Sequence, residues 1–337
     1  MIPNNIENIL DRLCGKRVLV VGDLILDHYL EGSVERISPE APVPIVSLES
    51  SEGNWVPGGA ANVARNISSL GGIPVMAGTA GDDREGSLLI RLLRDESIDT
   101  GALVLDPDRP TTSKTRVMSG GHQLIRLDRE ITRPISGELR ERIFSRIRDI
   151  VDELDVVVLE DYNKGVLVPG LISDVIALAR ERGIPVAVDP KFINFFEFRG
   201  CTLFKPNRLE TSRALGMEIL SVDDAVRAAG MLLKKLDAEA VLITLGSDGS
   251  ILCRRDAEPF HRPAAAVHVF DVSGAGDTVI AVMALSLAAG LSMEDGVRTS
   301  VFAAAATCAE PGVYAVRPED IIREVERYSR SNDPDQG

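Results

Sequence analysis

The sequence predicts an α/β protein of three layers, in which a mostly parallel central sheet lies between two layers of helices and carries a small β lid. Two observations lead to this fold class. Short apolar runs of strand length alternate with longer helical patterns, which is typical of consecutive βαβ units. Two further segments of β character interrupt the alternation and suit a separate small sheet.

The central sheet is predicted from apolar runs that fit strands buried on both faces, at 17–21, 156–159, 185–188, 202–204 and 241–244. Helical patterns lie at 62–70, 87–96, 137–153, 171–182, 222–236 and 278–289. The last of these is apolar on all sides, so we expect it to be buried. We expect one domain over residues 1–330, followed by a polar tail over 331–337.

The lid is predicted from segments at about 29–47 and 111–127. The first contains Pro39, Pro42 and Pro44 among β-branched residues, so it fits neither a long helix nor a central strand. The second alternates apolar and polar residues around Ser119-Gly120-Gly121 and predicts a hairpin. An exposed lid edge is a template for strand pairing, so we expect a homodimer through the lid.

Composition excludes several classes of protein. A hydrophobic content of 45% over 337 residues is typical of a globular protein with a substantial core. The net charge of -14 argues against a general nucleic-acid surface, which needs a basic face. The four cysteines, Cys14, Cys201, Cys253 and Cys308, form no C-x-x-C pair and indicate neither a zinc site nor a disulfide framework.

We expect a cytoplasmic protein that binds no membrane. The first residues show no basic start followed by an apolar core, so they do not resemble a signal peptide. The longest apolar stretch, 279–289, is too short to span a bilayer. Dispersed cysteines also suit a reducing compartment.

The most specific motif is Asp271-Val-Ser-Gly-Ala-Gly-Asp277, which leads directly into the apolar helix. Gly274, Ala275 and Gly276 are small enough for a ligand to approach the backbone, and their N–H groups at a helix N-terminus would bind an anion. Asp277 on the first turn could then take a proton from an incoming hydroxyl. The alternative is an acidic first-turn residue after a glycine turn. The chain contains neither a dinucleotide fingerprint nor a P-loop.

Two further motifs suit a polyhydroxylated ligand. Gly58 and Gly59 precede Asn62 at a helix start, where open backbone and an amide can bind hydroxyl groups, although close packing explains the glycines equally well. Asp23 follows an apolar strand, and in open parallel sheets ligands bind beyond the carboxyl ends of the strands. Asp23 can bind two sugar hydroxyls there, or it can cap the next helix.

These motifs, in this order, resemble the ribokinase-like carbohydrate kinases, also called the PfkB family, over roughly residues 17–327. The early signature resembles Gly58-Gly-Ala-Ala-Asn62 and the late one Asp271–Asp277. Between them, Asn207-Arg-Leu-Glu210 is similar to the N-x-x-E element, in which the Glu orders Mg²⁺ and water. Thr244-Leu-Gly246-Ser-Asp-Gly249 is similar to the glycine loop of the nucleotide site. The resemblance implies ATP and Mg²⁺, and it leaves open whether a monovalent cation near Asp271 assists.

A narrower resemblance is to the heptose-phosphate kinases. It rests on segments 36–44, 123–128, Asp161-Tyr-Asn-Lys164-Gly165 and Asp189-Pro-Lys191. It implies phosphorylation of the C1 hydroxyl of D-glycero-D-manno-heptose 7-phosphate, giving the 1,7-bisphosphate for ADP-heptose and lipopolysaccharide core synthesis. The group often carries a fused nucleotidyltransferase, and we expect this chain to be the stand-alone kinase form. Glu160 stands where the group usually has a small residue.

The resemblance also suggests which side chains meet the substrates. The sugar would lie between Asp23, Asn62 and the lid, and ATP across 207–210 and 244–249, with Asp277 as the base. The candidates for binding the sugar or its phosphate are Arg36, Arg116, Gln123, Arg126, Asp161, Lys164 and Lys191. Each of the cationic ones can instead be a solvated surface charge.

Two other functions remain open at this point. One is another ribokinase-like kinase that acts on a different sugar or on a nucleoside. The other is a non-catalytic sugar- or nucleotide-binding regulator on the same fold, although such a protein has no need of an acid at position 277.

Overall fold

The computed structural model describes residues 5–48, 53–265 and 269–331, so most of the predicted tail, 332–337, lies outside the described residues. The helices are α1 (Ile6–Leu13), α2 (Ala60–Ser69), α3 (Arg84–Asp95), α4 (Gly137–Ile150), α5 (Pro169–Glu181), α6 (Arg208–Leu215), α7 (Val222–Leu236), α8 (Ala275–Ala288), α9 (Met293–Cys308) and α10 (Pro318–Ser331). Two 3-10 turns, η1 (Val151–Glu153) and η2 (Gly246–Asp248), complete the helical elements of the described chain.

The main sheet has nine strands in the order β14-β13-β12-β11-β10-β9-β1-β5-β6. The central strands are parallel, and β13 and β14 add an antiparallel edge. The bounds are β1 (Arg17–Gly22), β5 (Ile73–Gly81), β6 (Asp99–Asp106), β9 (Val156–Glu160), β10 (Val186–Asp189), β11 (Leu203–Phe204), β12 (Ala240–Thr244), β13 (Ser250–Arg254) and β14 (Phe260–Arg262). The predicted α/β class with a mostly parallel sheet is confirmed.

Helices cover both faces of this sheet because alternate strand residues point to opposite sides. In β1, Val18 and Val20 pack into a core with α2, α8 and α9, whereas Leu19 and Val21 pack into a second core with α4, α5 and α7. The helix α8 lies entirely within the first core, and every residue from 277 to 286 is buried. A helix that is apolar on all sides is stable only when all of its faces are buried, as they are here.

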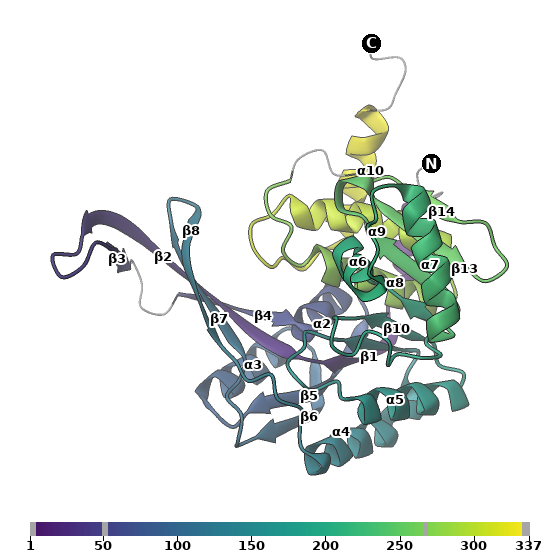
Figure 1. Ribbon diagram of the computed structural model, residues 1–337, viewed down its shortest axis with the longest axis horizontal. Helices are drawn as coiled ribbons and strands as arrows, with labels where there is room; N and C mark the ends of the chain where they lie inside the picture. The colour runs from purple at the N-terminus through teal and green to yellow at the C-terminus, as the bar shows by residue number, and fades with distance from the viewer. Residues whose placement is uncertain (1–4, 49–52, 266–268, 332–337) are drawn as a thin grey trace.

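The lid is a separate five-stranded sheet that projects from the layered body (Figure 1). Its strands are β2 (Leu24–Ile37), β3 (Pro44–Leu48), β4 (Asn54–Gly59), β7 (Ser113–Ser119) and β8 (His122–Arg129). The predicted hairpin at 111–127 is present as β7 and β8 with its turn at Gly120-Gly121, where both residues have positive φ.

The prediction for 29–47 is wrong in one respect. The strand β2 occupies residues up to 37 and lies inside the small sheet, between β3 or β4 on one side and β7 on the other. The prolines do not interrupt it because Pro39 and Pro42 lie in the connection after β2 and Pro44 begins β3.

Parallel alignment brings the carboxyl ends of β1, β9, β10, β11 and β12 to one edge of the main sheet. The N-terminus of α8 meets the same region, since a Cβ on Gly276 would lie 3.8 Å from Asp189 Oδ2 just after β10. In α/β sheets this edge is where ligands bind. Among the described residues, no helix is long and apolar enough to cross a membrane.

The end of β1 depends on close backbone packing, which gives a stability prediction. A Cβ at residue 22 would lie 2.1 Å from the carbonyl oxygen of Glu160 on β9. We expect Gly22→Ala to lower the free energy of unfolding by about 1–3 kcal/mol, since the backbone cannot yield without breaking the sheet. Urea unfolding followed by circular dichroism measures this.

A matched glycine supplies the control. Gly230 lies inside α7 with open space around it, so Gly230→Ala should raise the free energy of unfolding by up to about 1 kcal/mol. If Gly22→Ala is as stable as the wild type, the packing argument is wrong.

Candidate active site

Asp277 lies at the third position of α8, with only 5% of its surface exposed. The amide of Asn62, from α2, donates a hydrogen bond of 2.7 Å to its Oδ2. The hydroxyl of Tyr162, which follows β9, donates one of 2.7 Å to Oδ1. Three elements distant in sequence therefore orient one carboxylate.

Burial raises the pKa of Asp277 to about 6, against the lowering effect of its two hydrogen bonds. Burial and the charge of Asp277 likewise raise the pKa of Tyr162 well above its ordinary value, so the phenol stays a donor. A carboxylate with such a pKa is poised to accept a proton near neutral pH.

No side chain caps the first turn of α8, and of its N–H groups that of Ala275 donates to the carbonyl oxygen of Val272 at 3.3 Å. Gly274 has φ of +80°, and a Cβ there would lie 3.0 Å from the Asn62 amide nitrogen. A Cβ on Gly276 would point toward Lys205 Nζ at 3.7 Å. With Ala275 between them, these residues form the small-residue turn that the sequence predicts, at a helix end that favours anions.

A cluster of lysines and carboxylates surrounds this turn. Lys205, after β11, contacts Asp189 Oδ2 at 2.7 Å. Lys191 contacts Glu210 Oε1 at 2.9 Å and lies 5.0 Å from the centre of the Tyr162 ring. Burial alone lowers the pKa of Lys191, but the nearby carboxylates outweigh it and raise the pKa, so the ammonium stays charged.

The nucleotide-site candidates lie on adjoining strand ends. Asn207 caps α6 reciprocally with Glu210, each side chain accepting the other's backbone N–H at 2.8 Å. Asn207 also bridges to Thr244 at the end of β12. Gly246 and Gly249 flank η2, and Gly249 allows the chain to pass the carbonyl of Arg262, which a Cβ would approach to 2.0 Å.

Asp23 has a different environment from the one the sequence suggests. Its carboxylate accepts three backbone N–H groups, from Tyr162 at 2.8 Å, Lys164 at 2.9 Å and Val166 at 3.0 Å. Only 1% of its surface is exposed. Both oxygens are used in holding this loop, so contact of Asp23 with a sugar stays a prediction that this geometry does not favour.

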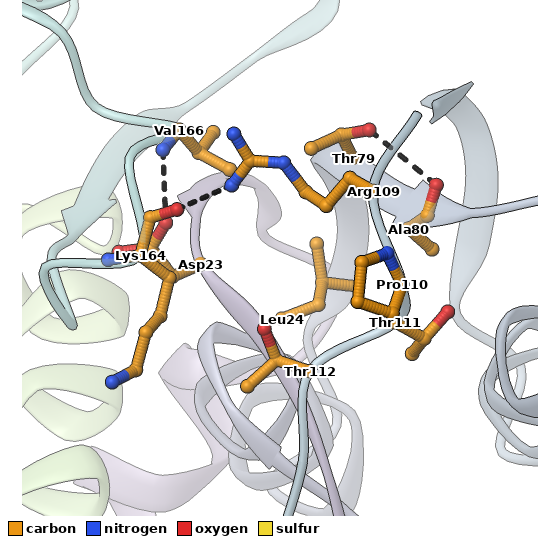
Figure 2. Close-up of a pocket in the computed structure, with 10 residues that line it drawn as sticks. All are labelled: Asp23, Leu24, Thr79, Ala80, Arg109, Pro110, Thr111, Thr112, Lys164 and Val166. Atoms are coloured by element: carbon orange, nitrogen blue, oxygen red, sulfur yellow. Dashed lines mark hydrogen bonds between the residues drawn. The ribbon is translucent and has the colours of Figure 1, made fainter. Parts of the chain in front are cut away.

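A cavity of about 10 Å³ lies beside Asp23, and Figure 2 shows its lining. Arg109 reaches over it and donates to the carbonyl oxygens of Lys164 at 2.5 Å and Arg133 at 2.6 Å. As described, this cavity has room for about one water molecule, and Asp23 and Arg109 beside it both hydrogen-bond to the backbone of the loop after β9.

A carboxylate that sequence reasoning missed lies beside the early glycine motif. Asp27, on β2, is buried, and a Cβ on Gly58 would lie 2.0 Å from its Oδ2. Arg116, on β7, contacts Asp27 Oδ1 at 2.5 Å. Gly59 has φ of +59° as the residue before α2. The signal was an isolated acid in the apolar run Leu24-Ile-Leu-Asp27.

The other residues predicted to bind the sugar lie either on the lid or in the loop after β9. Arg36 and Gln123 are exposed on β2 and β8, and Arg126 pairs with Asp128 on its own strand at 2.9 Å. Lys164 contacts Glu130 at 2.7 Å. Asp161 is buried and accepts the N–H of Asn163, and burial, assisted by the charge of Asp23, raises its pKa to about 7. Their contacts with a substrate stay predictions.

Asp271 connects the loop before α8 to the segment after α9. Its oxygens accept the N–H groups of Ser273 at 2.9 Å and Gly312 at 3.1 Å. A monovalent cation beside it stays a prediction.

Comparisons with known proteins show the family of the chain. Residues 16–320 match the family model described as pfkB family carbohydrate kinase. "Bifunctional protein HldE" of Pelobacter propionicus is 42% identical over 325 residues, and that of Geobacter sulfurreducens is 40% identical over 322. Each alignment covers 96% of this chain but only 66% and 65% of those proteins, so the chain spans just under two thirds of their length.

Solved structures show the same fold. Phosphofructokinase-2 from Escherichia coli in complex with potassium has a TM-score of 0.78 at 23% identity, covering 94% of this chain and 100% of that one. Arabidopsis thaliana ribokinase complexed with ribose and ATP has a TM-score of 0.73 at 21% identity, with coverage of 93% and 99%. At this identity the likeness concerns the fold alone.

The position of Asp23 gives a testable prediction. Replacing Asp23 by Ala leaves three backbone N–H groups, one buried and two half-buried, without their acceptor, so we expect a loss of about 3 kcal/mol in the free energy of unfolding. Amide hydrogen exchange of Tyr162, Lys164 and Val166 should accelerate. Asp23→Asn keeps one acceptor oxygen and should lose less. Unchanged exchange at these amides in Asp23→Ala would contradict the assignment.

Proposed function

Because the chain belongs to the pfkB family of carbohydrate kinases, we propose that it transfers the γ-phosphoryl group of ATP to the anomeric hydroxyl of D-glycero-D-manno-heptose 7-phosphate. The product would be the 1,7-bisphosphate used for ADP-heptose and lipopolysaccharide core synthesis. The observation that carries the kinase reaction is the buried Asp277 carboxylate, oriented by Asn62 and Tyr162 beside an uncapped helix N-terminus.

In this proposal Asp277 accepts the proton of the attacking hydroxyl. The N–H groups of the Gly274–Gly276 turn stabilise charge on the transferring phosphoryl group, as fixed donors do where charge develops. Lys191 and Lys205 lie around the same turn and add positive charge. Closure of the lid over the sugar would exclude water and suppress hydrolysis of ATP.

The nucleotide would lie across 207–210 and 244–249, the ends of β11 and β12 with their loops. Mg²⁺, when bound, would neutralise phosphate charge, and Glu210 would contribute to its site through water. Glu210 suits an outer role, since its oxygens already contact the N–H of Asn207 and the ammonium of Lys191.

The sugar assignment rests on the similarity of four segments, including 161–165 and 189–191, to the heptose-phosphate kinases. Arg116, Lys164 and Lys191 would bind the 7-phosphate, and Asp27 joins Asn62 as a further candidate for the sugar hydroxyls.

We place the reaction in the cytoplasm, where ATP is abundant and where the cysteines would stay the free thiols they are here.

The test is ATP consumption by the purified chain with Mg²⁺ and a panel of sugars, sugar phosphates and nucleosides. We expect turnover with heptose 7-phosphate and little with unphosphorylated sugars, because Arg116, Lys164 and Lys191 can bind the acceptor only through a phosphate group. Turnover with another acceptor only would retain the mechanism and reject the heptose. ATP binding without turnover on any acceptor would favour the non-catalytic regulator.

Replacing the base gives a second prediction. Asp277→Asn should lower kcat by about 10²–10⁴, the usual contribution of a positioned general base, while the affinity for ATP changes little. Asp295 supplies a matched control, because it occupies the same third position of the neighbouring helix α9. Asp295→Asn should turn over at the wild-type rate. A similar rate in both variants would remove Asp277 from its role.

We further propose a homodimer through the lid. The strand β8 is an edge of the small sheet and is exposed along its whole length. Its apolar side chains Leu124, Ile125 and Leu127 are exposed, as are Val34, Ile37, Val43 and Leu48 on or beside β2 and β3. Exposed apolar strands at a sheet edge favour pairing with another chain.

Sedimentation velocity tests the dimer. Ile125 and Leu127 lie two residues apart and share a face of β8, so Ile125→Glu with Leu127→Glu should give a monomer. Leu220→Glu, which changes an exposed leucine between α6 and α7, should leave the mass unchanged. A monomeric wild type, or a dimeric double variant, would refute the lid interface.

A further inference from the structure

One face of the lid carries charged side chains that lie above the loop after β9. Lys114 on β7 is the register partner of Asp27 on β2 and of Asp128 on β8, so the three side chains share this face. Arg116, two residues further along β7, lies on the same face. The Lys114 ammonium lies 5.8 Å from the centre of the Tyr162 ring, so this face of the lid is turned toward the candidate site.

The ammonium of Lys114 differs from its cationic neighbours in having no carboxylate partner. The neighbouring cations form ion pairs with acids of the same region, in the pairs Arg116–Asp27, Arg126–Asp128 and Lys164–Glu130. Among the residues that the structure describes, none forms an ion pair or a hydrogen bond with the ammonium of Lys114. The face therefore carries one positive charge in excess of its ion pairs.

The surroundings of Lys114 favour the approach of an anion. Burial lowers the pKa of its ammonium, and the charge of nearby Lys164 lowers that pKa further, although Asp27 acts in the opposite direction. A bound anion would relieve both effects, because it stabilises the charged form of the lysine. The side chain is only half-buried, so a ligand can reach it from solvent.

We propose that Lys114 binds the phosphate group of the acceptor and thereby makes the enzyme select phosphorylated sugars. The proposal rests on the proposed function, since it assigns a residue to the acceptor site of a sugar kinase. A phosphate monoester carries a charge of about -1.5 to -2 near neutral pH, which suits an ammonium without a partner. Arg116 and Lys164 can also contact this phosphate, but each of them shares its charge with a carboxylate.

The position of Lys114 also indicates which end of the acceptor carries the phosphate. The hydroxyl of Tyr162 donates to Asp277 Oδ1 at 2.7 Å, whereas the ring of Tyr162 faces Lys114. The tyrosine side chain thus lies between the base and the ammonium. A sugar that presents a hydroxyl to Asp277 and a phosphate to Lys114 must extend along this side chain. The substrates are therefore sugars whose phosphate lies at the opposite end from the reacting hydroxyl.

The experiment measures the affinities of the full chain for heptose 7-phosphate and for ADP by isothermal titration calorimetry. Lys114→Met should weaken the binding of heptose 7-phosphate at least about tenfold, the contribution of one hydrogen bond between charged groups, and leave the affinity for ADP unchanged. Lys114→Arg keeps the charge and should retain most of the affinity. In turnover assays, Lys114→Met should raise the KM for the phosphorylated sugar and change kcat little.

Lys16 supplies the matched control. It is also half-buried, but it precedes β1 and so lies at the opposite edge of the main sheet from the site. Lys16→Met should bind heptose 7-phosphate and ADP as the wild type does.

Several outcomes would overturn the proposal. One is wild-type affinity of Lys114→Met for heptose 7-phosphate, and another is an equal loss of affinity for ADP, which would indicate a general disturbance of the fold. A wild type that accepts a different sugar phosphate receives the same test with that compound, and one that accepts only unphosphorylated sugars refutes the proposal.

Failure of this subsite and failure of the kinase proposal are distinguishable. Phosphorylation of heptose 7-phosphate with the same KM in the wild type and in Lys114→Met would refute the role of Lys114 alone. Binding of heptose 7-phosphate that depends on Lys114, without turnover, would retain the subsite and reject the kinase reaction on this sugar.

Discussion

The burial of α8 determines where the reacting groups lie. Its apolar residues pack into the core between the main sheet, α2 and α9, and the helix cannot slide without opening that core. Its first turn is therefore fixed beyond the ends of β9 and β10, where Asp277 meets Tyr162 and the carboxylates of neighbouring strands. An apolar helix thus acts as the rigid support of a buried group of charged side chains.

Patterns that depend on local sequence predicted much of the fold. The helix α7 has the bounds expected from its periodicity, because capping groups at Ser221 and a left-handed Asp237 mark its ends. Other elements were not predicted, or not to their full length, for physical reasons. The helix α9 is rich in small residues and buried on most of its surface, so it has little of the two-faced pattern that identifies a surface helix. The length of β2 was hidden by prolines that lie after it.

The residues of the candidate site likewise include some that local sequence identifies and some that it does not. Contiguous motifs identified Asp277, Asn62 and the glycine turn, since their residue types at that spacing suit one chemistry. Sequence reasoning did not identify Tyr162, Lys205 or Glu160, because each follows or ends an ordinary apolar strand. These residues come close to Asp277 only when the parallel strands align their carboxyl ends. The position of Asp23 after a strand predicts a ligand site, whereas its three hydrogen bonds to backbone N–H groups could not be predicted, because they arise only when the loop after β9 folds against β1.

The strand β2 joins the body to the lid without a flexible connection. It begins two residues after β1 ends, and its first residues, Leu24 to His28, are buried. As far as Tyr29 it is paired with β4, and as far as Glu31 with β7, whereas from Gly32 onward it pairs with β3. The first half of β2, residues 24–31, is therefore held by neighbouring strands on both sides and should bend little. The lid closure that we propose would therefore require twisting or bending of β2 near Glu31, where its pairing partners change, and the stiffness of the backbone there would limit the rate of closure.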